Sequence, residues 1–141
     1  MVTPVSIRFR RGEVVDRLKA EASARHMSSS ALAEELIDEG LRTRRHPLIA
    51  FRDGMAGRRA GLVGGPDVWE VIAGLVGGDV RADQRVERAA EQLGLPRAAV
   101  SAALDYYAQF TEEIDAELAS NLAASAEAEA AWRKRHRILL G

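Results

Sequence analysis

The chain of 141 residues contains no cysteine, 5% aromatic residues and two lysines. The absence of cysteine excludes disulfide frameworks and thiolate zinc sites. No apolar run approaches the roughly 18 residues of a membrane span. Arginines interrupt the N-terminal segment, where a signal peptide would need an apolar stretch. We therefore expect a cytoplasmic protein that is not bound to a membrane.

Catalytic motifs are also lacking. The sequence has neither GxxxxGK[ST] nor GxGxxG, the glycine patterns that bind nucleotide phosphates. His26, His46 and His136 are dispersed without the spacing of metal ligands. The serines beside His26 have no acid or oxyanion hole at a recognisable spacing. We expect no enzymatic activity, no metal and no cofactor.

What the chain does have is a core-forming composition and an uneven charge. Hydrophobic residues make up 47% of the sequence, enough for a folded core. Residues 1–64 hold 12 Arg/Lys and 8 Asp/Glu, a net charge of +4. Residues 65–141 hold 8 and 13, a net charge of −5. This distribution predicts a nucleic-acid contact in the first half and a different partner for the second.

Residues 5–10 alternate apolar and polar side chains, which predicts a short strand with one buried face. The apolar set is Val5, Ile7 and Phe9, and the polar set is Ser6, Arg8 and Arg10. A lone strand leaves its backbone groups unpaired, and no comparable strand follows closely. We expect it to pair antiparallel with the same strand of a second copy. Such a ribbon fits the DNA major groove, whereas the alternative is a solvated strand at a sheet edge.

Two amphipathic helices are predicted next. The first begins near residue 12 or 13, and Ser28 is a suitable N-cap for the second, which includes residues 31–41. The second helix has an apolar face at helical spacing, formed by Leu32, Leu36, Ile37 and Leu41.

The segments VSIRF and SSSALAEELIDEGL, with a helix and turn between them and a basic end, resemble a ribbon-helix-helix DNA-binding module of the Arc/MetJ/CopG type. The resemblance covers about the first third of the chain. It implies a homodimer whose alternate polar strand residues contact operator bases, here Ser6, Arg8 and Arg10. It also implies a phosphate contact at the start of the second helix, here Ser28, Ser29 and Ser30.

The sequence predicts a boundary at Pro47, which prevents a simple continuation of the helix. Residues 1–46 would form the ribbon-helix-helix module, 47–110 a helix-turn-helix-like domain, and 111–141 a C-terminal helix and arm. Glycines around residues 48–52 and 58–63 indicate a small β-hairpin. Its arginines, which would either contact the DNA backbone or lie solvated in loops, are Arg52, Arg58 and Arg59.

The rest of the chain is predicted to be helical. A helix from Asp67 to Gly77–Gly78 should bury Val68, Trp69, Ile72 and Val76. A pair follows at about 84–93 and 97–107, and Leu104, Tyr107 and Phe110 should extend its apolar face. The motif GMAGRRAGLVGGPDVWEVI, with this helix pair, is similar to a small antitoxin-associated helix-turn-helix domain of bacteria. That family pairs with PIN-type toxins. The helix pair has few exposed basic residues, so we favour a packing role over DNA binding.

A last helix should open at Thr111–Glu112–Glu113, with Thr111 as the cap, and end in AWRKRHRILLG. Exposed aromatic, arginine and aliphatic residues together are typical of a binding hot spot. The candidates are Trp132, Arg133, Arg137 and Leu139. The plainer interpretation is an ordinary helix end whose cations complement the helix dipole.

These patterns predict a mainly α fold and an antitoxin of the VapB kind. It would repress its own operon and neutralise a PIN-domain ribonuclease through the C-terminal arm. The alternative is a stand-alone ribbon-helix-helix repressor, and a weaker one is an adaptor that uses the N-terminal module for protein contacts.

Overall fold

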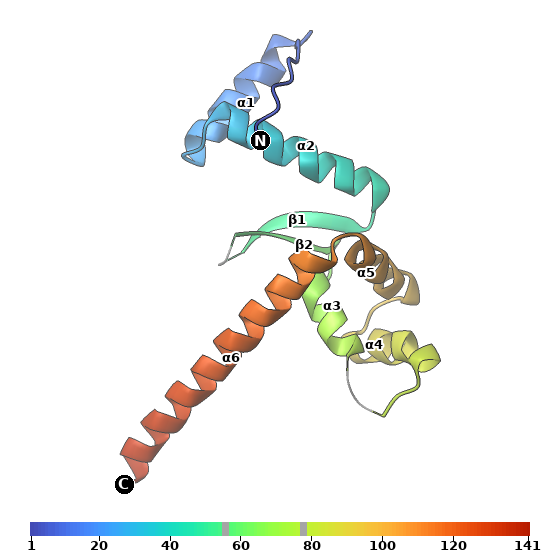
Figure 1. Ribbon diagram of the computed structural model, residues 1–141, viewed down its shortest axis with the longest axis vertical. Helices are drawn as coiled ribbons and strands as arrows, with labels where there is room; N and C mark the ends of the chain where they lie inside the picture. The colour runs from blue at the N-terminus through green and yellow to red at the C-terminus, as the bar shows by residue number, and fades with distance from the viewer. Residues whose placement is uncertain (55–56, 77–78) are drawn as a thin grey trace. The chain divides into compact units, whose positions relative to one another are not determined.

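A computed structural model describes residues 1–54, 57–76 and 79–141, and divides the chain into two compact units, residues 1–44 and 45–141. The described residues are mainly helical, with one two-stranded antiparallel sheet (Figure 1). The mainly α prediction with a small hairpin is confirmed. The predicted pairing of N-terminal strands involves a second copy, and it stays a prediction.

The first unit contains helix α1 (Gly12–Ala24) and most of helix α2 (Ser29–Arg45). A tight turn joins them, because His26 adopts a left-handed conformation with φ 56°. The N–H of Met27 then donates to the carbonyl of Ala22 at 2.9 Å, which satisfies a free carbonyl at the end of α1. Ser28 Oγ accepts the N–H of Ala31 at 3.1 Å, so the predicted N-cap is confirmed.

The apolar face of the first unit is only partly covered. Ala22 of α1 and Leu32 of α2 are buried. The other members of the predicted apolar face of α2 stay half or more exposed, with 50% for Leu36, 47% for Ile37 and 63% for Leu41. Residues 1–9 are assigned to no strand within the single chain.

The second unit starts with the predicted hairpin. Strands β1 (Ile49–Gly54) and β2 (Gly57–Leu62) pair antiparallel, with Ile49 opposite Leu62 and Arg52 opposite Arg59. Ile49, Ala60 and Leu62 are buried, so one face of the hairpin belongs to the core. The two residues between the strands lie outside the described part of the chain.

Helices complete the second unit: α3 (Val68–Leu75), a short 3₁₀ turn (Ala82–Gln84), α4 (Arg85–Leu93), α5 (Arg97–Gln109) and α6 (Thr111–Leu140). The predicted turn between α4 and α5 is confirmed. Gly94 supplies its left-handed residue, with φ 65°, and the N–H of Leu95 donates to the carbonyl of Ala90.

The core of this unit lies between the hairpin and helices α3, α4 and α5, with Ile114 of α6 added. One predicted core position is wrong. Val76 follows the end of α3 and is 71% exposed. In α5 the fully buried positions are Val100, Ala103 and Tyr106. The predicted residues Leu104, Tyr107 and Phe110 are partly buried and pack against the same core. The predicted end of α3 at Gly77–Gly78 lies outside the described residues.

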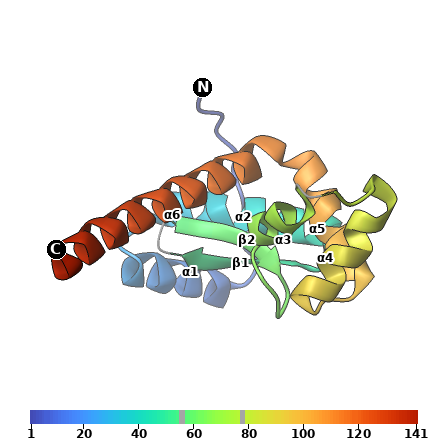
Figure 2. The same ribbon diagram turned by 90° about the horizontal axis from the view of Figure 1, so that it is seen from below.

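Helix α6 leaves this core soon after it begins. Ile114 is its one fully buried residue, and in both views the C-terminal half runs away from α3, α4 and α5 (Figure 2). Thr111 is not the cap. Phe110 occupies that position, and the Thr111 hydroxyl donates back to the carbonyl of Tyr107 at 2.7 Å. Within the described ranges, no helix is both long and apolar enough to cross a membrane.

Candidate nucleic-acid interface and partner surface

The N-terminal segment lies against α1 and α2 with its two faces in different environments. Ile7 and Phe9 line an apolar hollow of about 780 Å³, together with α1 and α2 residues that include Val14, Leu18, Leu36 and Ile37. Ser6, Arg8 and Arg10 do not line it. The structure therefore places the predicted apolar set on the helix side and leaves the predicted base-contacting set outside it.

This hollow is not closed by the single chain. Val5, Ile7 and Phe9 are 79%, 54% and 45% exposed. Apolar side chains of this size are normally buried in a folded protein, and a contiguous exposed group of them marks an interaction surface.

The polar set of the segment is free to make new contacts. Ser6, Arg8 and Arg10 are exposed. Among the described residues, none of the three has a hydrogen bond or ion pair with another part of the chain. On a strand, side chains two positions apart project to the same side, so Arg8 and Arg10 would lie on one side if the segment paired as a strand.

The three serines at the start of α2 do not play equal parts. Ser28 Oγ is already occupied by the N–H of Ala31. Ser29 and Ser30 form the first turn of α2, where backbone N–H groups have no acceptor within the helix. An anion can bind such N–H groups, because they point out of the positive end of the helix dipole.

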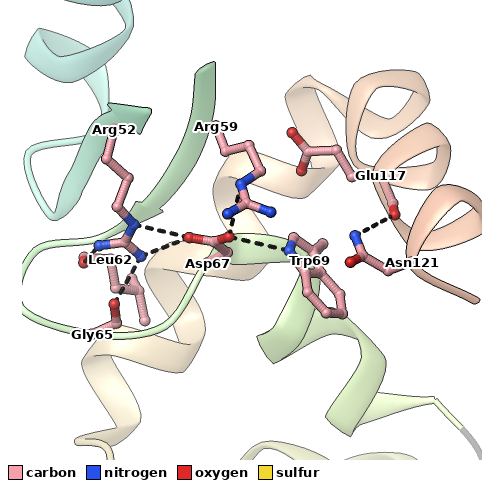
Figure 3. Close-up of polar contacts among 8 residues, drawn as sticks. All are labelled: Arg52, Arg59, Leu62, Gly65, Asp67, Trp69, Glu117 and Asn121. Atoms are coloured by element: carbon pink, nitrogen blue, oxygen red, sulfur yellow. Dashed lines mark hydrogen bonds and ion pairs between the residues drawn. The ribbon is translucent and has the colours of Figure 1, made fainter. Parts of the chain in front are cut away.

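In the second unit, two of the three hairpin arginines contact a buried carboxylate (Figure 3). Asp67 is 5% exposed. Its Oδ1 accepts the Nε of Arg52 at 2.9 Å, and its Oδ2 lies 3.2 Å from the Nε of Arg59. The Oδ2 also accepts the indole N–H of Trp69 at 3.2 Å. Asp67 therefore joins both strands of the hairpin to the first turn of α3.

This cluster corrects the sequence-based interpretation of the hairpin arginines. We expected them either to contact DNA or to lie solvated in loops. Instead, Arg52 also donates to the carbonyl of Gly65 at 2.8 Å, and Arg58 pairs with Asp53 at 3.3 Å. Arg52 and Arg59 are directly opposite each other in the sheet, which would be repulsive without the carboxylate between them.

The glycines of the hairpin were the sequence feature that could have indicated this arginine cluster. A Cβ at Gly54 would collide with the Arg59 guanidinium, and one at Gly61 with that of Arg52. The side chains of both arginines therefore cross the sheet over positions without a side chain. The spacing of glycine and arginine in the hairpin was visible in the sequence, but the position of Asp67 beneath it was not.

Glu117, near the start of α6, borders the same cluster (Figure 3). Burial, with a smaller contribution from the nearby carboxylates of Glu113 and Asp67, raises the pKa of Glu117 to about 7, although Arg59 opposes the shift. Its Oε2 is buried without a hydrogen-bond partner in the described structure.

The α4–α5 pair was predicted to pack rather than to bind DNA. Two of its arginines are exposed: Arg97 forms an ion pair with Glu87 at 3.2 Å, and Arg85 donates to the carbonyl of Val80 at 3.2 Å. Asp105, also exposed, adds negative charge on the outer side of α5. The two helices hold three arginines and three acids, so the pair has no excess of positive charge to attract phosphate.

The C-terminal tip carries the predicted partner-binding residues on a continuous helix. Trp132 is 61% exposed and stacks on His136 with ring centroids 4.9 Å apart. Leu139 is 77% exposed. Arg133 forms an ion pair with Glu129, one turn earlier, whereas Arg137 has no ion pair or side-chain hydrogen bond in the described structure.

Comparison with protein-family models, curated proteins and solved structures finds no match for this chain. Within residues 1–54, 57–76 and 79–141, no group of three or more histidine or acidic side chains is placed to hold a metal ion. The geometry of the two surfaces is therefore the basis for assigning a function.

Proposed function

We propose that two copies of this chain form a DNA-binding homodimer through residues 5–10 and the hollow beside them. The observation that carries this proposal is the split environment of the N-terminal segment. Ile7 and Phe9 line a hollow that one chain leaves open, while Arg8 and Arg10 lie exposed and have no ion pair with the described part of the chain. A second segment, added antiparallel, would pair the backbone of both and cover the apolar side chains.

The resulting ribbon would present six polar side chains, three from each copy: Ser6, Arg8 and Arg10. Arginine binds guanine through two hydrogen bonds in the major groove, and each good bidentate pair contributes about 1–3 kcal/mol of discrimination. Backbone N–H groups at the start of α2 would bind phosphates and fix the register of the ribbon on the duplex. The DNA site would be a palindrome, because the dimer has twofold symmetry.

We further propose that the protein is an antitoxin that represses its own operon, with α6 as the arm that neutralises a PIN-domain ribonuclease. Support comes from the tip of α6, where Trp132, Leu139 and two arginines are exposed on one helix. A PIN-type active site is a cluster of acids that holds divalent metal. Arg137, which has no ion pair with any residue that the structure describes, is suited to enter such a cluster and compete with the metal.

The stand-alone repressor remains the second candidate, since it shares the DNA-binding half of the proposal. The two candidate functions differ in the role of α6, which binds a nuclease only in the antitoxin proposal. Tagged full-length protein isolated from its native lysate should carry a stoichiometric small nuclease, identified by mass. Recovery of the protein alone would favour the stand-alone repressor.

The role of the arm is tested with that nuclease. Deleting residues 120–141 should abolish neutralisation of the nuclease and leave operator binding intact, because the deletion spares the N-terminal unit. Full neutralisation by the truncated chain would exclude α6 as the inhibitory arm.

A further inference from the structure

Helix α6 carries its charges in two separate blocks. All of its acids precede all of its lysines and arginines: Glu112, Glu113, Asp115, Glu117, Glu127 and Glu129 come first, followed by Arg133, Lys134, Arg135 and Arg137. The segment between 118 and 131 is rich in alanine. We call the N-terminal part of α6 its root and the C-terminal part its tip. When a second copy lies beside the helix in the opposite direction, each basic tip approaches an acidic root, so the two helices have complementary charges.

One face of α6 is apolar at both ends. Leu118, Leu122 and Ser125 follow a 4–3 spacing, and the same spacing continues through Glu129 to Trp132 and His136. With 3.6 residues per turn, these positions share one side of the helix. At the root, this side forms a hollow. At the tip, it bears the stacked Trp132–His136 pair.

The hollow at the root lies between α3 and α6 and has a volume of about 440 Å³. Its walls are mostly apolar and comprise Trp69, Ala73 and Val76 with Leu118, Asn121, Leu122 and Ser125. Val76 and Leu122 are each 71% exposed, so the single chain leaves the hollow open.

We infer that α6 of a second copy packs antiparallel on this face and inserts its Trp132 into the α3–α6 hollow. In that register, Leu122 faces Trp132 of the second copy, and Leu118 faces its His136. Between its two ends this face carries Ser125 and Glu129, and the small side chains of Ala126 and Ala128 on its flanks leave room for a second helix. Parallel packing would instead place acid against acid and leave each hollow facing another hollow.

The inference uses only the second unit and does not require the DNA-binding proposal. It does bear on the antitoxin proposal, because the same tip would contact the nuclease. Pairing of the arms and binding of the nuclease would then exclude each other. The nuclease would have to separate the arms before it could be neutralised.

Cysteine cross-linking tests the register directly, since the chain has no cysteine of its own. Asn121 and Arg135 lie on the same flank of the proposed contact face and are 14 residues apart. In an antiparallel pair, position 121 of one copy approaches position 135 of the other. Two copies of position 121 would be about 21 Å apart along the helix, beyond the reach of a disulfide.

Full-length Asn121→Cys and Arg135→Cys variants, with tags of different size, would be co-expressed and oxidised. We expect a mixed disulfide dimer and little cross-linking when either variant is expressed alone. The matched control is the pair Ala123→Cys and Lys134→Cys, which lies on the opposite face and should not cross-link. Cross-linking within either single variant, or no mixed product, would overturn the antiparallel pair.

A second variant tests the Trp132 contact in the same assay. Trp132→Ala should lower the yield of mixed dimer about tenfold at limiting concentration, the effect of losing about 1.4 kcal/mol of association free energy. Ile138→Ala is the control, because Ile138 is 81% exposed and lies on the opposite face. Equal effects of the two substitutions would refute insertion of Trp132 into the hollow.

Discussion

Asp67→Asn should destabilise the second unit strongly, because Asp67 holds two arginines and an indole together. The asparagine is isosteric but uncharged, so both guanidinium groups lose their counter-ion. Removing one partner of a buried ion pair costs about 3–5 kcal/mol. Here the side chains of Arg52 and Arg59 are 37% and 26% exposed, so water compensates for part of the loss. We expect a decrease of about 2–3 kcal/mol in the free energy of unfolding.

The measurement is urea unfolding of the full chain, followed by the fluorescence of Trp69 in a Trp132→Phe background. Trp69 donates its indole N–H to Asp67, so its emission reports on this cluster. The matched control is Asp53→Asn, which loses the ion pair with Arg58 in the same hairpin. Asp53 is 64% exposed, and exposed pairs contribute at most about 1 kcal/mol. Equal effects of the two substitutions would refute the central role assigned to Asp67.

Two further predictions concern proton binding and helix capping. The pKa of Glu117 is about 7 in the folded chain against an ordinary value of 4.5, so the folded state binds this proton more tightly and stability falls as pH rises from about 4.5 to 7. Glu117→Gln should therefore stabilise the protein at pH 8 by about 1 kcal/mol, after discounting for solvent exposure, and should have no such effect at pH 4. A gain in stability that does not change with pH would contradict this prediction. Ser28→Ala should destabilise the first unit by about 1 kcal/mol in urea unfolding, because it removes the cap on Ala31, whereas Ser30→Ala should have little effect. Equal losses for these two serines would argue against the cap.

Local signals in the sequence were sufficient for the helices, the hairpin and their turns. Ser28, Gly94 and Pro47 act through the chain immediately around them, and each has the predicted structural role. The side of α5 that faces the core was harder to predict, because several of its faces carry apolar residues. Tyr106 is fully buried and donates its hydroxyl to Glu113 at 2.8 Å, whereas the predicted Tyr107 is half-buried.

Long-range polar contacts could not be predicted. Arg52 and Arg59 were expected at the surface, since arginine usually is exposed. Their role depends on a carboxylate from another segment and on Gly54 and Gly61, which make room for their side chains. The two candidate surfaces, at residues 5–10 and at the tip of α6, could be predicted because their signals are local. These signals are the alternation of apolar and polar residues in the first and the apolar residues near the end of the second.

Binding of DNA by the N-terminal segment is the central claim, and one titration tests it most directly. Duplexes that bind the full-length protein would be selected from a random pool, and the dissociation constant of the best site measured for wild type, Arg8→Ala and Arg81→Ala. We predict a palindromic site, a loss of about 1–3 kcal/mol per half-site for Arg8→Ala, and no comparable loss for Arg81→Ala, which removes an exposed arginine of the second unit. Equal affinity of Arg8→Ala and wild type, or no enriched sequence, would contradict the account.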